Sequence, residues 1–114
     1  MTKLEFQIPK QPWVSKDDFV DNGYSFTVTA VEKVQKSWKD KQGNNFETLR
    51  LNFDDNGVNR YFDCPTIKEI AYALSVYGSD TDDFIGQKVE LQLVSKTNDL
   101  GIAKTYIQFV GQQS

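Results

Sequence analysis

The chain has 114 residues, a net charge of −3, one cysteine and no histidine. This length fits one domain with its own core, while a single thiol excludes an internal disulfide and leaves no set of nitrogen and sulfur ligands for zinc. No apolar run approaches the roughly 20 residues that span a membrane, and the N-terminus lacks the apolar core of a signal peptide. We therefore expect a soluble, cytoplasmic protein that makes no membrane contact.

Residues 1–22 have the composition of an arm that leads into the domain. They contain two prolines, the alternating run LEFQI at residues 4–8 and a polar stretch before the first strand. An alternating run of this kind can add a strand to the sheet edge of a neighbour, which would produce a homo-oligomer through the arm. Trp13 either packs the arm onto the domain or contacts a partner, and the sequence leaves both roles open.

The next segments predict a long hairpin. Residues 24–34 are rich in β-branched and aromatic side chains, with a change of phase after Ala30 that is typical of a bulge. Residues 35–45 form a polar, lysine-rich connection that ends in Gly and Asn, so we expect an exposed hairpin tip carrying Trp38. A second strand is predicted at residues 46–53.

Alternation in the second and third strands assigns their faces. In the second strand we expect three large apolar residues to face the core: Leu49, Leu51 and Phe53. Its intervening polar residues should face outward: Thr48, Arg50 and Asn52. The DDNG sequence at residues 54–57 predicts a tight turn into a third strand at residues 58–64. There, Phe62 and Cys64 should point inward and Asn59, Tyr61 and Asp63 outward.

Residues 66–77 are the one segment with a clear helical period. Five apolar residues recur at steps of three and four and are expected to form its buried stripe: Ile67, Ile70, Ala71, Leu74 and Tyr77. Thr66 and Glu69 have the spacing of a capping box, and Gly78 can adopt the left-handed conformation that ends a helix. The acidic residues that follow are expected to cap a short turn into Phe84.

Two further strands complete the predicted order, at residues 88–95 and 102–110. Short antiparallel strands need closure to hide their edges, and a five-stranded Greek-key barrel with one helix between strands 3 and 4 meets that need. The predicted fold is therefore an all-β OB-fold. We assign it to residues 23–111, with a frayed end at 112–114; a different small barrel and a curled α+β sheet are the alternatives.

Residues 62–93 resemble small phage-encoded OB-fold proteins, which are usually found among replication and recombination functions. The resemblance is carried by the helix that starts at Thr66 and by the sequence YGSDTDDFIGQKVEL, in which a glycine and an acidic turn precede an aromatic residue, a glycine and a strand. This element turns the chain from helix to strand and holds no catalytic group. The resemblance implies binding of single-stranded DNA, with a place in phage replication or recombination.

The long hairpin and the two strands after it combine the residue types that bind single-stranded nucleic acid. Such surfaces need cations that follow the phosphates and aromatic faces on which bases stack, and strands 2 and 3 are the usual ligand face of an OB-fold. The predicted contact residues are Lys33, Lys36, Trp38, Lys39, Lys41, Phe46, Thr48, Arg50, Asn52, Asn59, Arg60, Tyr61, Lys96 and Lys104. Lys96 and Lys104 would form a second wall. The structural alternative is a solvated hairpin with an incidental tryptophan.

The sequence lacks the groups of an enzyme. No phosphate-binding loop and no Ser–His or Cys–His pair is present, no cofactor or metal site is predicted, and without histidine Cys64 has no base to activate it. Asp80, Asp82 and Asp83 lack the spacing of a calcium loop. We predict a non-enzymatic protein that binds single-stranded DNA, or RNA, with low sequence specificity. The alternative is a viral accessory module that binds a protein through the same surface, which the acidic overall charge favours.

Overall fold

The computed structural model describes residues 11–39 and 41–112 and is mostly β-structure. Its strands are β1 (Gly23–Lys39), β2 (Asn45–Asp55), β3 (Val58–Asp63), β4 (Lys88–Thr97) and β5 (Ala103–Phe109). A short 3-10 turn, Lys16–Asp18, precedes them, and the helices α1 (Ile67–Tyr77) and α2 (Thr81–Phe84) lie between β3 and β4. Within the described residues, no helix is long and apolar enough to cross a bilayer.

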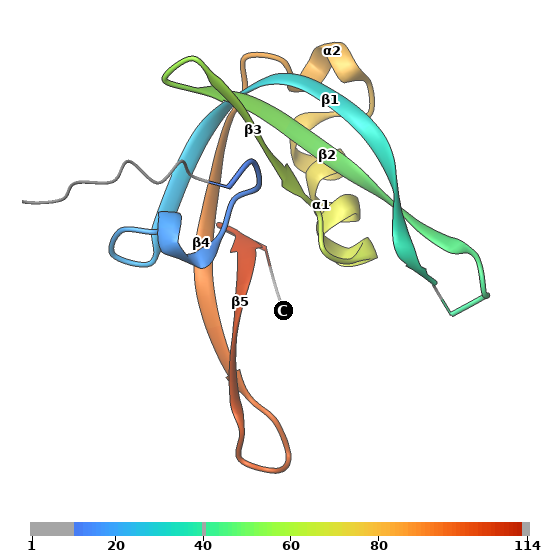
Figure 1. The fold of residues 1–114 in the computed structure, drawn as a ribbon, viewed down its shortest axis with the longest axis vertical. Coiled ribbons are helices and arrows are strands. Elements are labelled where there is room, and N and C mark those ends of the chain that lie inside the picture. Colours follow the sequence, from blue (N-terminus) through green and yellow to red (C-terminus); the bar gives the residue numbers. More distant parts are fainter. Residues whose placement is uncertain (1–10, 40, 113–114) are drawn as a thin grey trace, which may run out of the picture.

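All five strands form one curled antiparallel sheet in the order β3-β2-β1-β4-β5, which has the shape of a half-barrel (Figure 1). The first part of β1 pairs with β4 and the second part with β2. The β1–β2 and β4–β5 hairpins project from the body, with the start of α1 on the side that faces the space between them (Figure 1). The radius of gyration is therefore 16.2 Å, against about 13 Å for a compact domain of this length.

The segment before the sheet covers the outer edge of β3. The amide of Tyr61 donates to the carbonyl of Pro12 over 2.8 Å, and the amide of Val14 donates to the carbonyl of Tyr61 over 2.9 Å. Trp13 thereby forms a parallel bridge to Tyr61. This part of the predicted arm is attached to the sheet, whereas the LEFQI run and the oligomer contact predicted for it lie outside the described residues.

The core lies on the inner face of the curled sheet. Its buried apolar residues are Val14, Phe26, Val28, Leu51, Phe53, Phe62, Cys64, Ala73, Phe84, Val89, Leu91 and Phe109. Phe62 and Cys64, exposed by 4% and 1%, confirm the inward phase predicted for the third strand. Phe62 packs edge-on against Phe109 with the ring centroids 5.6 Å apart. The two outer strands of the sheet, β3 and β5, therefore contact each other through core side chains.

The first strand is longer than predicted. β1 continues to Lys39, so the polar connection expected at residues 35–45 is wrong over its first half. These residues lack apolar alternation, but β2 supplies their backbone with partners as far as the pair Lys39–Asn45. The register is irregular between Val28 and Ala30, close to the predicted bulge. Trp38 therefore lies on β1, within one strand of the hairpin and not at its tip.

The predicted helix is present, with α1 beginning at Ile67 and ending at Tyr77, but its expected stripe is only partly correct. Ile70 and Tyr77 pack against the core as expected. Ile67 and Leu74 are exposed by 69% and 40%. The expectation was wrong because α1 buries a neighbouring face, on which Ala73 and the polar residue Glu69 take the most enclosed positions.

Hydrogen bonds explain how Glu69 occupies a buried position. Its carboxylate accepts from the side-chain amide of Gln112 over 3.0 Å and from the hydroxyl of Thr66. The capping box expected between Thr66 and Glu69 is not formed, because the Thr66 hydroxyl donates to the carboxylate. A capping box does form at α2, between Asp80 and Asp83, and confirms the predicted turn into Phe84.

Candidate nucleic-acid interface

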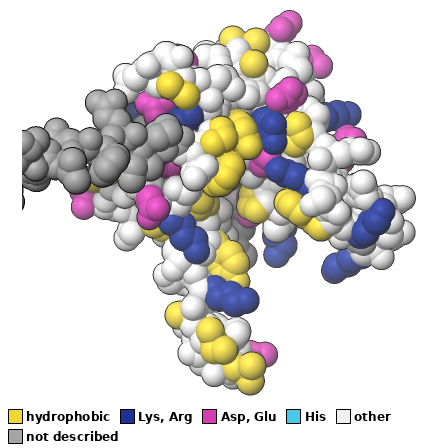
Figure 2. Space-filling view, viewed as in Figure 1, with side chains coloured by type: hydrophobic (Ala, Val, Ile, Leu, Met, Phe, Trp, Pro, Cys, Tyr) yellow, Lys and Arg dark blue, Asp and Glu magenta, His cyan; other side chains and the backbone are white. Residues whose placement is uncertain are grey.

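A groove of about 1130 Å³ lies between the two projecting hairpins. The β1–β2 hairpin forms one wall, the β4–β5 hairpin forms the other, and β3 with the start of α1 forms the floor. Trp13 and Val14 line it from the N-terminal segment. Figure 2 shows Lys and Arg side chains gathered around this groove, while most acidic side chains on the same face lie nearer the outline of the molecule.

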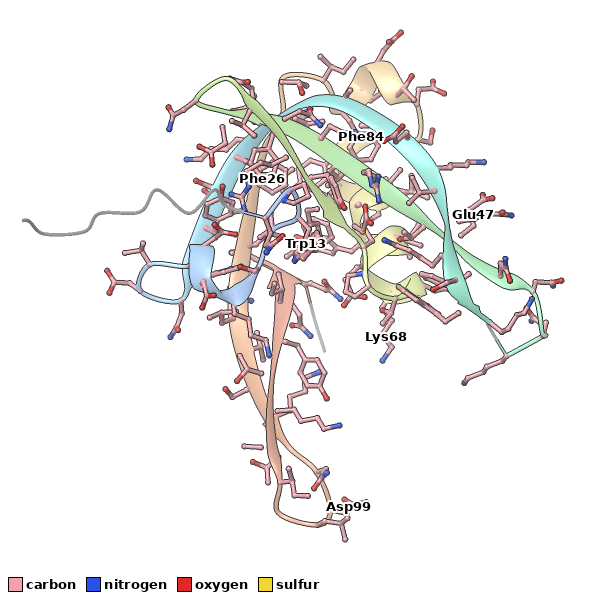
Figure 3. All side chains as sticks on the ribbon, viewed as in Figure 1. Trp13, Phe26, Glu47, Lys68, Phe84 and Asp99 are labelled. Atoms are coloured by element: carbon pink, nitrogen blue, oxygen red, sulfur yellow. The ribbon has the colours of Figure 1, made fainter. Side chains whose placement is uncertain are left out.

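Positive charge predominates in the groove. Among the residues that the structure describes, six lysines and two carboxylates line it: Lys16, Lys36, Lys39, Lys41, Lys68 and Lys96, with Asp63 and Glu69. The fold therefore collects a local surplus of positive charge on a chain whose net charge is −3. Figure 3 shows Lys68, at the start of α1, projecting into the space between the hairpins. Sequence reasoning missed Lys16 and Lys68, because neither lies near the predicted hairpin in the sequence.

Three large aromatic side chains in the groove are partly open to solvent. Trp38, Trp13 and Tyr106 are exposed by 52%, 47% and 45%. Trp38 stacks on Phe46, with the ring centroids 6.1 Å apart and the planes 16° apart. Phe46 is exposed by only 8%, so it supports the indole and offers little surface of its own. Trp13 attaches the N-terminal segment to the domain through its bridge to β3, and it also lines the groove; its contact with a partner stays a prediction.

A cluster of charged residues lies where the first wall meets the floor. The carboxylate of Asp63 accepts hydrogen bonds from Nε and Nη2 of Arg50, over 2.8 and 3.0 Å, and from Nζ of Lys36. The Arg50 guanidinium lies 3.8 Å above the ring of Tyr61 and covers one face of it. Burial alone would raise the pKa of Asp63, but the hydrogen bonds from Arg50 and Lys36 lower it below the ordinary value. Asp63 is therefore ionised at neutral pH.

Four predicted contact residues from the middle of the sheet lie outside the groove lining: Thr48, Arg50, Asn52 and Asn59. Thr48 is 2% exposed and donates to the carbonyl of Cys64, and Asn52 is 8% exposed and accepts from the side-chain amide of Asn59. The outward positions predicted for Thr48 and Asn52 are wrong, because both side chains are buried and hydrogen-bonded within the protein. Asn59 is exposed, but its amide is used in this strand-to-strand bond.

Two predicted lysines also lie outside the groove lining. Lys33 is exposed, stands opposite Leu49 in the register, and has its Nζ 3.9 Å from the Glu47 carboxylate. Lys104 is exposed and stands directly opposite Lys96, which does line the groove. Like charges in directly opposite positions destabilise a strand pair. An anion bound at this wall would relieve that repulsion.

Arg60 is not a surface cation, and its predicted role as a contact residue is wrong. It is 1% exposed, because its register partner is the core residue Phe53. Its Nη2 lies 2.8 Å from the Asp18 carboxylate, and its Nη1 lies 3.3 Å from Asp55. Its guanidinium also donates to the backbone carbonyls of Gln11 and Trp13, each over 3.0 Å. Arg60 therefore attaches the N-terminal segment to the sheet and positions Trp13.

Cys64 is expected to resist thiol reagents in the folded protein. Burial, together with the nearby carboxylates of Glu69 and Asp63, raises the pKa of this thiol to about 12. Because the thiolate is the nucleophile, a chromogenic disulfide reagent should react slowly from pH 7 to pH 9 and quickly once denaturant is added. Rapid reaction of the folded protein at neutral pH would contradict the buried position.

No protein-family model, curated protein or solved structure matches this chain. The candidate site therefore stands on its own geometry. Within residues 11–39 and 41–112, no three His, Cys, Asp or Glu side chains gather closely enough to hold a metal ion.

Proposed function

We propose that the groove binds single-stranded DNA with little sequence preference and without catalysis. Bases stack on Trp38 and on the other exposed rings, while the lysines of both walls follow the phosphates. The observation that supports this most is the meeting of six lysines and three exposed aromatic rings in one groove of an acidic chain. A place in phage replication or recombination follows from the sequence resemblance of residues 62–93 alone.

The distribution of charge supports a phosphate-bearing ligand. Phosphate binding releases counterions from a basic surface, so the local charge of a groove matters more than the net charge of the chain. The lysines come from separate parts of the sequence, namely the N-terminal segment, β1, the β1–β2 connection, α1 and β4. A polyanion that passes through the groove contacts all of them at once.

The rings support a ligand with flat faces. Single-stranded nucleic acids lie with their bases on aromatic side chains, and each stacked base contributes about 1–3 kcal/mol. Trp38 is already oriented by Phe46 beneath it, so little side-chain entropy is lost when a base stacks on its open half. The ε-ammonium of Lys36 lies 5.7 Å from the centroid of the Trp38 ring, which places a cation beside the base platform.

The proposal extends to the fold. We regard the half-barrel as an OB-fold with Greek-key connections, opened between β3 and β5. In support, β1 pairs with both β2 and β4, and the principal helix lies between β3 and β4. Oligonucleotides bind OB-folds on the face of strands 2 and 3 and between the loops that flank it. The groove, whose floor includes β3 and whose first wall includes β2, has the corresponding position.

Titration with oligo-dT while tryptophan fluorescence is recorded tests the proposal. At low salt and micromolar protein, a saturable change in emission is expected, because both Trp13 and Trp38 line the groove. A double-stranded oligonucleotide of the same length should compete poorly, since its bases are not free to stack. Unchanged emission at every oligo-dT concentration would contradict the proposal.

A second candidate function is binding of a protein partner through the β4–β5 hairpin. Leu100 and Ile102, at the end of this hairpin, are exposed by 83% and 54%, and neighbouring exposed apolar side chains can form part of an interaction patch. Figure 3 shows Asp99 at the same tip, away from Lys68. Leu100→Ser should leave oligo-dT binding unchanged and abolish binding of such a partner.

A further inference from the structure

We propose that Lys36 and Arg50 form a seat for one phosphate group of the bound strand, and that Asp63 occupies this seat when no strand is bound. The carboxylate then competes with the ligand, so that Asp63 restrains binding at the site it lines. This inference rests on the proposed function and adds to it a regulating residue.

The geometry of the cluster is that of anion recognition. Arg50 presents Nε and Nη2 to the two oxygens of Asp63, over 2.8 and 3.0 Å, and Lys36 donates to the second of these oxygens. Paired donors of a guanidinium bind carboxylate and phosphate in the same bidentate way. A phosphodiester oxygen pair can therefore replace the carboxylate without any change in the donors. Stacking on Tyr61 at 3.8 Å keeps the guanidinium plane in this orientation.

The cluster lies where a strand on the base platform would pass. Asp63, Lys36, Tyr61 and Trp38 line the groove, and Arg50 lies just outside this lining, where it is hydrogen-bonded to Asp63. Nζ of Lys36 lies 5.7 Å from the Trp38 ring centroid, so a cation stands beside the base platform. A nucleotide stacked on Trp38 thus brings a phosphate toward Lys36 and Arg50, and at that point it meets the negative charge of Asp63.

The accessibility of these side chains separates the cluster from a structural ion pair. The side chains of Arg50, Lys36 and Asp63 are exposed by 23%, 21% and 12%. In the Arg60–Asp18 pair of the same sheet, the side chains are exposed by only 2% and 5%. The first cluster is therefore partly open to solvent, whereas the second is enclosed. Among the described residues, the carboxylate of Glu32 also lies near Arg50, 4.0 Å from Nη1, and its side chain is 55% exposed, so it offers weaker competition.

The test compares Asp63→Asn with Glu47→Gln in the full-length protein, with labelled oligo-dT as the probe. Both changes raise the net charge by one, but Glu47 lies on the outer side of the hairpin, beside Lys33. We expect Asp63→Asn to bind about tenfold more tightly than the unchanged protein, because two charged donors are released. Its binding should also fall more steeply with salt, because more phosphates are neutralised. Glu47→Gln should change the affinity by less than about twofold.

Equal tightening by both variants would overturn the proposal, since bulk charge would then explain the effect. Unchanged or weaker binding by a folded Asp63→Asn variant would overturn it as well, since Asp63 would then support the site. Should Asp63→Asn fail to fold, Asp63→Ser provides the same comparison. Failure of both the unchanged protein and Asp63→Asn to bind rejects the proposed function itself, whereas binding by both with equal affinity rejects only the role given to Asp63.

Arg50→Gln supplies an independent measurement. If Asp63 occupies the seat, removing the guanidinium from the unchanged protein should lower the affinity by less than about threefold. The same change in the Asp63→Asn variant should remove most of the gained affinity. Equal losses in the two backgrounds would show that Arg50 and Asp63 act independently, which contradicts a shared seat.

Discussion

Trp38→Ala is expected to weaken oligo-dT binding by about tenfold to a hundredfold, more than any single lysine substitution in the groove. One stacked base contributes about 1–3 kcal/mol, and every 1.4 kcal/mol corresponds to a tenfold change in affinity. Trp38 is the most exposed of the three rings, at 52%, and its stacking on Phe46 holds it in place. The measurement is the equilibrium dissociation constant of a fluorescently labelled dT oligonucleotide.

Two control variants make the Trp38 result specific. Trp38→Phe keeps a stacking face and should retain most of the affinity. Ile85→Ala removes a side chain that is 52% exposed and does not line the groove, so it should have no effect. A Trp38→Ala protein that is folded and binds as tightly as the unchanged protein would contradict the stacking mechanism.

Arg60→Met is expected to lower the free energy of unfolding by about 3–5 kcal/mol, the usual cost of removing one partner of a buried ion pair. The substitution removes the guanidinium that faces the Asp18 carboxylate, whose side chain is only 5% exposed. It also removes two hydrogen bonds to the backbone of the N-terminal segment. The measurement is urea denaturation followed by circular dichroism. Such a loss is a large part of the stability of an ordinary domain.

The control for Arg60 is a cation of the same sheet that is exposed. Lys33→Met breaks an ion pair between side chains that are 81% and 53% exposed, so it should change the free energy of unfolding by less than about 1 kcal/mol. Arg60→Met should also weaken oligo-dT binding, because Trp13 loses the anchor that holds its backbone at the groove. A folded Arg60→Met protein with unchanged stability would show that the cluster does not hold the N-terminal segment.

The strands and the helix could be predicted where apolar residues alternate with the period of the element. Val89, Leu91 and Phe109 are buried as their alternation indicated, and α1 has the expected ends. The second half of β1 could not be predicted in this way. Residues 35–39 show no alternation of apolar and polar side chains, because the hairpin projects into solvent, so only their pairing with β2 makes them part of a strand.

The candidate site was predicted in its general position but not in its composition. Lys36, Trp38 and Tyr61 follow from the hairpin and from the face assigned to the third strand. The position of Arg60 did not follow, because a charged residue in a strand is normally expected to face solvent, and its partner Asp18 lies far away in the sequence. The sequence places Asp63 on the outward face of the third strand. Its position opposite Arg50 in the β2–β3 pair was the signal that could have indicated the charged cluster.

The dependence of oligo-dT affinity on salt tests most directly the claim that this groove binds a single strand through cations and rings together. Fluorescence anisotropy of a labelled dT oligonucleotide, measured at about 50 mM and about 200 mM salt, gives two dissociation constants. If four phosphates are neutralised, the affinity should fall by about fiftyfold between these conditions. Micromolar or tighter binding at the lower concentration with a fall of this size supports the account. No binding at the lower salt concentration, or an affinity that salt leaves unchanged, would contradict it.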